Sequence, residues 1–359
     1  MKKPFFSLLA GTVLSGVVLT LSPVVQPHFA AAAARLGAKP PYVIALSNSF
    51  IGNAWRAQME NEVKAESMTP QDRSQVKKLI VENAGQDAAA QISQMQGMIA
   101  QHVNAILVDA ASPTSLNNVI RQANQQGITV VSFDNLVTSP YAIKQNYSNT
   151  DWGAAGMNFI AKVLHGKGRV VLIEGEAGAG AEVDRENGVA QVLKTYPNIT
   201  VAARVNGNWS DSGGHQAMTS VLASGTKFDA IWSSGGMAGG IISALLQAHH
   251  PLVPITDAAF NNYLKLLKQY GGKGLTGLAV GDTDYSGALA LNTALAALQG
   301  HHVSMNIINP IRTYTVANPA TKNNPNLPDT FNVDYTSPQL GSQGQLTVQD
   351  VLHGSCCYK

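Results

Sequence analysis

Short segments of strand-forming residues alternate with longer helical stretches from residue 42 onward, and this rhythm constrains the fold more than any other feature. A strand is expected over 42–47 and a helix over 53–67, where Trp55, Met59 and Val63 recur at helical spacing. Strands that alternate with helices form βαβ units, whose right-handed crossovers build parallel sheets with helices on both faces. The sequence therefore predicts an α/β fold.

The alternation occurs in two successive blocks. Further strands are expected at 78–83, 105–110 and 128–133 in the first block, and at 169–175, 199–205, 228–234, 252–256 and 275–280 in the second. Helices are expected at 86–101, 113–126, 151–165, 182–196, 211–224, 237–248, 259–270 and 285–299. Two such blocks predict two similar lobes, each built on a doubly wound parallel sheet.

The composition excludes several classes of protein. Lys and Arg number 24, Asp and Glu number 22, and no basic block stands out, so nucleic-acid binding lacks its electrostatic footprint. The two cysteines are too few for a disulfide scaffold or a four-cysteine metal site. The hydrophobic content of 45% is ordinary and is enough for a sizeable core.

The N-terminus has the parts of a secretory signal peptide. Lys2 and Lys3 precede an apolar stretch over 5–21, and a run of alanines follows at 30–34. We expect residues 1–34 to be removed on export, and no lipid anchor is expected because no cysteine lies near the cut. An uncleaved membrane anchor is the alternative, although the apolar stretch is short for a span.

Several strands end in residues that suit an uncharged, polyhydroxylated ligand. Ligands of open α/β sheets sit beyond the carboxyl ends of the strands. The residues there that carry this interpretation are Trp55, Asp134, Arg185, Trp209 and Asp257. Asp and Arg make paired hydrogen bonds with neighbouring hydroxyls, and Trp offers a face to the C–H side of a sugar ring.

Each of these residues also has an interpretation without a ligand. Trp55 fits a core position of its helix, and Asp134 and Asp257 fit helix caps or turns. Arg185 fits the solvated face of a helix. Their shared position at the strand ends favours the ligand-binding interpretation over these alternatives.

No motif for catalysis, a metal or a cofactor stands out. The glycines at 175–180 run G-x-x-G-x-G and lack the spacing of a dinucleotide-binding loop. The histidine pairs at 249–250 and 301–302 are chain neighbours, whose side chains point in different directions. No Ser/His/Asp or paired-carboxylate arrangement can be argued from the spacing. We therefore expect no cofactor and no metal site.

Six segments follow one another along the chain: "SNSFIGNAWRAQM", "ITVVSFDN", "NYSNTDWGAAG", "RVVLIEGEAGAGAEVDRENG", "FDAIWSSGGMAGGIISAL" and "PITDAAF". In their order and spacing, over residues 42–315, they resemble the periplasmic sugar-binding proteins of ABC transporters, of the ribose-binding type. The resemblance implies a type I periplasmic binding protein fold and a monomer in the periplasm. It also implies a protein that is no enzyme and that delivers a sugar or polyol to the permease subunits of the transporter.

The resemblance further implies a set of ligand-binding residues. The matching positions are Asn53, Trp55, Asp134, Arg185, Trp209 and Asp257. Three positions depart from the ribose-binding pattern: Asn135 stands in place of an Arg, Gly235 in place of an Asn, and 281–282 in place of a Gln. Asn135 and Asp282 are kept as candidate ligand contacts. The departures favour a different pentose, a hexose or a polyol over ribose.

The lobe boundaries follow from the same resemblance. The first lobe is expected over 40–143 plus 284–304, and the second over 148–280 plus 307–315. Crossings of a three-stranded hinge fall near 140–148, 280–285 and 302–310, and the lobes close on the ligand. The extension 316–359 has no assigned role. At its end, Cys356 and Cys357 could form a vicinal disulfide, cross-link to another molecule or stay free.

Two other functions are alternatives. The same lobes would suit a sugar or signal-molecule sensor for a membrane receptor, or an exported α/β enzyme, because a fold alone does not fix a function. A repressor is disfavoured by the signal peptide and by the lack of an N-terminal helix-turn-helix. Deleting the protein separates transport from sensing, because either uptake or signalling should fail. Accumulation of a product during incubation with a sugar would indicate an enzyme.

Overall fold

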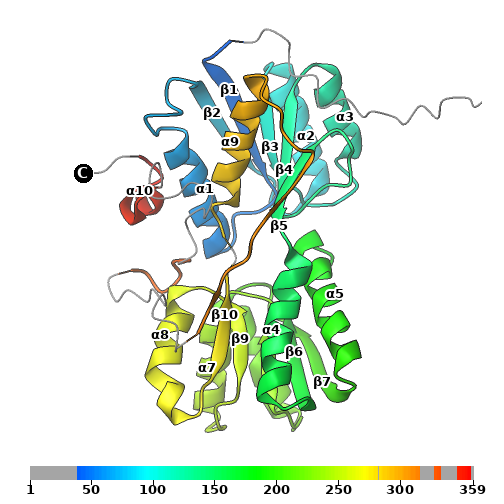
Figure 1. Ribbon diagram of the computed structural model, residues 1–359, viewed down its shortest axis with the longest axis vertical. Coiled ribbons are helices and arrows are strands. Elements are labelled where there is room, and N and C mark those ends of the chain that lie inside the picture. The colour runs from blue at the N-terminus through cyan, green and yellow to red at the C-terminus, as the bar shows by residue number, and fades with distance from the viewer. Residues whose placement is uncertain (1–38, 282, 316–326, 333–345, 357–359) are drawn as a thin grey trace, which may run out of the picture. The chain divides into compact units, whose positions relative to one another are not determined.

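Two six-stranded sheets, each flanked by helices, form the two lobes of the chain (Figure 1). The computed structural model describes residues 39–281, 283–315, 327–332 and 346–356. The strand order is β11-β5-β4-β3-β1-β2 in the first sheet and β12-β10-β9-β8-β6-β7 in the second. All pairings are parallel except that of β12 with β10. The predicted α/β class with two doubly wound lobes is confirmed.

The first lobe contains strands β1 (Tyr42–Asn48), β2 (Val76–Asn83), β3 (Ala105–Asp109), β4 (Thr129–Phe133), β5 (Ile143–Tyr147) and β11 (Asn306–Asn309). Its helices are α1 (Ala54–Glu66), α2 (Ala88–Ala100), α3 (Asn117–Gln125) and α9 (Ser286–Leu298). The short helix α10 (Val348–His353) packs against α1. Cys356, just beyond α10, is disulfide-bonded, which excludes a free thiol at this position.

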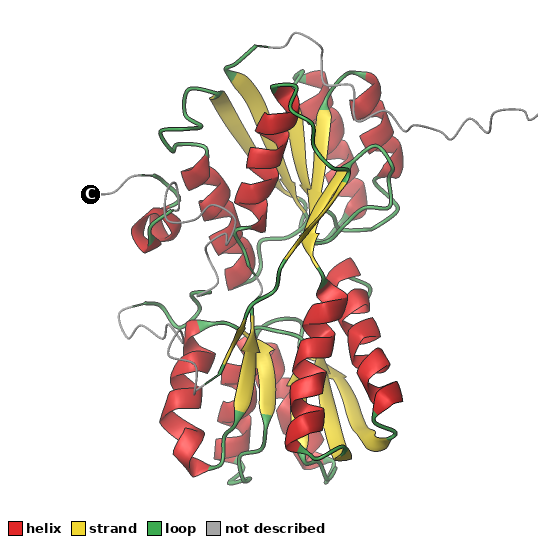
Figure 2. Cartoon of the chain, in the orientation of Figure 1, coloured by secondary structure: helices red, strands yellow, loops and turns green. Residues whose placement is uncertain are grey.

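The second lobe contains strands β6 (Lys167–Glu174), β7 (Asn198–Asn206), β8 (Ala230–Ser233), β9 (Ile255–Ala258), β10 (Gly277–Val280) and β12 (Thr313–Tyr314). Its helices are α4 (Asn149–Val163), α5 (Gly180–Thr195), α6 (Asp211–Ala223), α7 (Ala238–Gln247) and α8 (Asn261–Tyr270), followed by a 3₁₀ turn (Gly271–Lys273). Red helices lie on both sides of the yellow strands in both lobes (Figure 2).

The central strands are buried along their whole length, as parallel strands covered on both faces require. Every residue of β3 and β4 is buried. Side chains on one face, such as Leu107, join a core with α1 and α9, and those on the other face, such as Ile106, join a core with α2 and α3. None of the helices in the described part of the chain is long and apolar enough to cross a membrane.

Two strands of the first sheet lie where the sequence predicted crossings between the lobes. Strand β5 falls within 140–148, and β11 pairs with β5 although 307–309 were expected in the second lobe. The first lobe therefore extends to Tyr147 and to Asn309, which corrects the expected boundaries. Strand β5 reads IKQNY and β11 reads NIIN, so neither is an apolar run long enough to be recognised as a strand.

The chain passes between the lobes at three places. It leaves the first sheet after β5 and enters α4, which packs on β8, β9 and β10 of the second lobe. It returns between β10 and α9, because α9 packs on β3, β4 and α1. It crosses again between β11 and β12. The carboxyl ends of both sheets lie next to these crossings, so the loops after the strands face one another.

Candidate functional site

A cavity of about 230 Å³ lies among the loops that follow the strands of both lobes. It is lined by Gly52, Asn53, Ala54, Trp55, Arg56, Asp134, Ala181, Arg185, Trp209, Ser210, Asp211, Gly235, Gly236, Phe260, Asn262 and Thr330. Five of the eight residues predicted to bind a ligand are in this set. Within the part of the chain that the structure describes, the charged lining residues are two arginines and two aspartates.

The start of α1 places an amide, an indole and a guanidinium on the cavity wall. The side chain of Asn53 caps α1 by accepting a hydrogen bond from the backbone N–H of Arg56 at 2.9 Å. This cap fixes the first turn, which carries Trp55 and Arg56 into the lining. The Arg56 guanidinium carbon lies 5.1 Å from the centroid of the Trp55 ring. Trp55 is 7% exposed, so it is both a core residue and a lining residue.

Arg56 is a site residue that the sequence did not indicate. It forms ion pairs with Asp109, at the end of β3, and with Asp134, after β4, at 3.0 Å. Both aspartates are buried, and a buried carboxylate requires a partner. The strand end at Asp109 and the helix start at Arg56 were both visible in the sequence, but nothing there showed that they meet.

Asp134 and Asn135 follow β4 and have different surroundings. Asp134 adopts a left-handed backbone conformation with φ of 50°, which turns its carboxylate toward Arg56 in the lining. The Asn135 amide donates to Asp134 at 3.0 Å and to Asp109 at 3.1 Å. Its oxygen accepts from the backbone N–H of Ala181, at the start of α5, at 3.0 Å. Asn135 therefore connects the two lobes beside the main cavity, and it lines an adjoining hollow instead.

Arg185 of α5 is buried, which excludes a solvated helix face. Its guanidinium donates to Asn149 at 2.9 Å, to the hydroxyl of Tyr147 at 3.0 Å and to the carbonyl of Ser234. The group also lies 4.1 Å from the centroid of the Trp152 ring. These contacts hold Arg185 in one orientation on the cavity wall.

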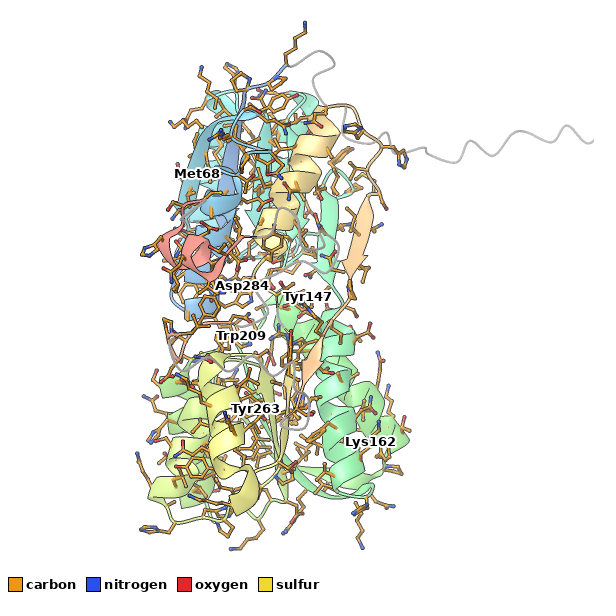
Figure 3. The ribbon with its side chains drawn as sticks, turned by 60° about the vertical axis from the view of Figure 1, so that its left-hand side comes forward. Met68, Tyr147, Lys162, Trp209, Tyr263 and Asp284 are labelled. Atoms are coloured by element: carbon orange, nitrogen blue, oxygen red, sulfur yellow. The ribbon has the colours of Figure 1, made fainter. Side chains whose placement is uncertain are left out.

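Trp209 lies at the end of the second lobe that faces the first (Figure 3). Its indole N–H donates to the hydroxyl of Ser234 at 3.1 Å, and that hydroxyl donates to the buried carboxyl of Glu182. Gly175 allows this arrangement, since a Cβ there would overlap the Trp209 ring. Burial raises the pKa of Glu182 to about 7, against the lowering effects of Ser234 and Arg185. Glu182 therefore positions Trp209 without lining the cavity.

Asp257 does not line the cavity, contrary to expectation. Its carboxylate accepts from the backbone N–H groups of Met237 at 3.0 Å and Ala238 at 2.6 Å, and from the hydroxyl of Ser233 at 3.0 Å. It satisfies the free N–H groups at the start of α7, whose own N-cap residue makes no side-chain bond. The structure thus favours the helix-capping interpretation. Burial raises the pKa of Asp257 to about 7, and its hydrogen bonds oppose this shift.

The second lobe supplies Asp211, the first residue of α6, to the lining instead. Its carboxylate accepts from Asn262 at 2.8 Å and from the backbone N–H of Gly240 at 3.0 Å. Burial raises the pKa of Asp211. Phe260 adds a third aromatic side chain to the wall. The predicted contact Asp282 lies outside the described residues.

Metal binding finds no support in the ranges 39–281, 283–315, 327–332 and 346–356. No group of three or more His, Cys, Asp or Glu side chains there is arranged to hold a metal ion. The cavity offers hydrogen-bonding groups and aromatic faces, which are the parts of a reversible binding site.

A family model described as a periplasmic binding protein domain matches residues 44–302. The chain belongs to this family. Its members are binding proteins rather than enzymes, and they act in the periplasm, which implies export. The match includes the strand ends that line the cavity from both lobes.

Individual family members support the assignment. The chain is 30% identical over 221 residues to the xylitol-binding protein of Mycolicibacterium smegmatis, covering 60% of this chain and 63% of that relative, which is less than two thirds of its length. It is 23% identical over 307 residues to the ribose import binding protein of Bacillus subtilis, covering 84% and 96%. An ABC transporter solute binding protein from Thermobispora bispora matches with a TM-score of 0.74 and 27% identity, over 82% of this chain and 91% of that one. The resemblance to ribose-binding-type proteins is confirmed.

Proposed function

We propose that this periplasmic binding protein captures an uncharged sugar or polyol between its two lobes and delivers it to the permease of an ABC transporter. The observation that carries this proposal is the charge balance of the cavity. Among the described lining residues, the two positive side chains, Arg56 and Arg185, are matched by two negative ones, Asp134 and Asp211. An ionic ligand would bring a charge for which the described part of the lining holds no counter-charge, and burying an unpaired charge is costly.

Cavity size and wall chemistry support the same ligand class. At about 230 Å³ the cavity is smaller than the ~300–1,000 Å³ that holds a drug-sized molecule. Trp55, Trp209 and Phe260 offer apolar faces to C–H groups, and the arginines and aspartates offer paired donors and acceptors to hydroxyls. A monosaccharide or a linear polyol has both kinds of surface.

Export and delivery complete the proposal. Residues 1–34 act as a cleaved signal peptide, and the mature chain works as a monomer that closes around its ligand by motion at the three crossings. It releases the ligand unchanged to the permease subunits. The named relatives bind xylitol and ribose, which makes pentoses and pentitols the first compounds to test.

A thermal-shift screen of the mature protein tests the ligand class. The panel contains pentoses, hexoses and polyols, with the corresponding sugar acids and amino sugars as charged controls. A ligand at about 100 times its dissociation constant adds about 2.7 kcal/mol of stability and several degrees to the melting temperature. We expect a neutral compound to respond and its charged analogue to fail. A response only to charged compounds would contradict the proposal, as would product formed during incubation.

A further inference from the structure

The C-terminal extension, to which the sequence assigned no role, contributes to the ligand cavity. Residues 327–332, called the strap below, bring Thr330 into the lining. Among the residues that the structure describes, no other lining residue comes from beyond the last strand of the two sheets. The strap is therefore an addition to the two-lobe scaffold that reaches the binding site.

The strap is fixed to the second lobe at the start of α8. The backbone N–H of Asn261 donates to the carbonyl of Phe331 at 2.9 Å, and its side chain donates to the carbonyl of Leu327 at 3.0 Å. The backbone N–H of Asn262 donates to the carbonyl of Asp329 at 2.9 Å. Phe331 is 3% exposed, so the strap has its own apolar anchor.

The strap is also tied to the first lobe, through Gln58 of α1. The Gln58 side chain accepts from the backbone N–H of Asn332 at 2.9 Å and donates to the carbonyl of Asn332 at 3.0 Å. Both residues are buried. Gln58 follows Trp55 by three residues, about one helical turn, so the Gln58–Asn332 pair lies close to the cavity wall.

We propose that the strap is a fourth wall of the ligand site, in which Thr330 contacts the ligand and the Gln58–Asn332 pair fastens the lobes over it. This inference rests on the proposed function and deepens it. A fourth wall on a cavity of about 230 Å³ limits the space for a second sugar unit, so the ligand is a single monosaccharide or a linear polyol. The amide pair has to break before the lobes can separate, and ligand release is slowed accordingly.

Hydrogen exchange on the full exported chain tests the fastening without any ligand. In the wild type, we expect the peptide that contains 327–332 to be protected, because its backbone is hydrogen-bonded to both lobes. Gln58→Met keeps the length of the side chain but removes both hydrogen bonds, and we expect exchange in this peptide to become about tenfold faster. Gln125→Met, at an exposed position of α3, serves as the matched control and leaves the peptide unchanged. A strap that exchanges like unfolded chain in the wild type would overturn the proposal.

Binding experiments with the ligand found in the sugar and polyol panel test the wall. Thr330→Phe should weaken affinity about tenfold or more by overfilling the site, and Gln58→Met should speed dissociation about tenfold. Thr200→Phe, on the exposed part of β7, is the control for the first change. A wild type that binds nothing in the panel defeats the proposed function. A wild type that binds, with both variants behaving like it, defeats the strap proposal alone. A disaccharide that binds as tightly as its monosaccharide also defeats it.

Discussion

Arg56 and Arg185 reach the cavity from opposite lobes, and the protein itself holds each of them in place. Arg56 pairs with two buried aspartates, and Arg185 donates to oxygens of Tyr147, at the end of the first lobe, and of Asn149 and Ser234, in the second. A side chain that is already ordered loses little conformational entropy when a ligand binds. The two guanidinium groups are thus preorganised to donate hydrogen bonds to the hydroxyl groups of a ligand.

Replacing Arg185 by Lys should weaken ligand binding by about 10- to 100-fold. The ammonium group cannot donate to Asn149, Tyr147 and Ser234 at once, so the position loses its fixed orientation. Isothermal titration calorimetry measures the effect. Arg169→Lys is the matched control, because Arg169 also donates a fork of hydrogen bonds, to Asp229, but on an exposed edge of the second lobe. Equal affinity in both variants would show that Arg185 does not act on the ligand.

The buried carboxyl of Glu182 should make the protein less stable as the pH rises from about 4.5 to 7. Burial raises its pKa from 4.5 to about 7, so between these values the folded chain holds a proton that the unfolded chain has released. The free energy of unfolding then falls with rising pH and levels off above pH 7. The contribution of Glu182 is about 3 kcal/mol across this window.

Urea unfolding at a series of pH values checks the Glu182 prediction. Glu182→Gln cannot titrate yet keeps an oxygen for the Ser234 hydroxyl, so its unfolding free energy should fall less over the same window. The remaining slope comes from other carboxyls whose pKa is raised by burial, among them Asp72, which follows α1 in the chain, and Asp257, each to about 7. Identical pH profiles for the wild type and Glu182→Gln would show that the pKa of Glu182 is not raised.

The rule that ligands bind at strand ends predicted Trp55, Asp134, Arg185 and Trp209 as ligand-binding residues, and all four line the cavity, as does Asn53, which the resemblance implied. The same rule also predicted Asp257, but a carboxylate at a strand end can turn toward the ligand or toward the next helix, and that of Asp257 turns toward α7. The sequence could not show that Arg56 belongs to the site, because its position depends on an ion pair with Asp109, which lies far away in the sequence. Position along the chain predicts which loop a residue occupies, and only packing decides which way it turns.

At the scale of elements, the capping of α7 depends on a side chain from another strand. Asp257→Ala should lower the free energy of unfolding by about 1–3 kcal/mol, because two buried backbone N–H groups lose their acceptor. Asp257→Asn keeps one acceptor oxygen and should lose less. Urea unfolding measures both, and titration of the folded variants should show unchanged ligand affinity. Lost affinity in a folded Asp257→Asn protein would place this residue in the binding site after all.

Most elements could be predicted, because buried parallel strands are continuous apolar runs and helices between them are periodic. Strands β5 and β11 were not predicted because neither is a continuous apolar run. They lie next to each other at the edge of the first sheet, and β5 carries Lys144, Gln145 and Asn146 in its centre. Backbone hydrogen bonds hold such strands in the sheet. Because these bonds do not depend on the side chains, the sequence pattern does not indicate them.

At the scale of the whole molecule, contacts that join the lobes should contribute to affinity without touching the ligand. Asn135 accepts from the N–H of Ala181 across the lobes, and this bond exists only while the lobes are together. Asn135→Ala should weaken binding about two- to tenfold, mostly through faster dissociation. Stopped-flow fluorescence of the tryptophans measures the rates. Asn118→Ala, at an exposed position of α3, is the control, and an unchanged dissociation rate in Asn135→Ala would contradict the prediction.

The balance of charges around the cavity has a consequence for where such a protein can work. Dissolved ions weaken the attraction between a charged site and a charged ligand, and the weakening grows with salt concentration. Here the formal charges of the described wall residues cancel, and each arginine is paired or hydrogen-bonded inside the protein. Affinity for a neutral compound should then be nearly the same at low and at high ionic strength. A cell that cannot control the ionic strength outside its inner membrane would still collect its nutrient equally well.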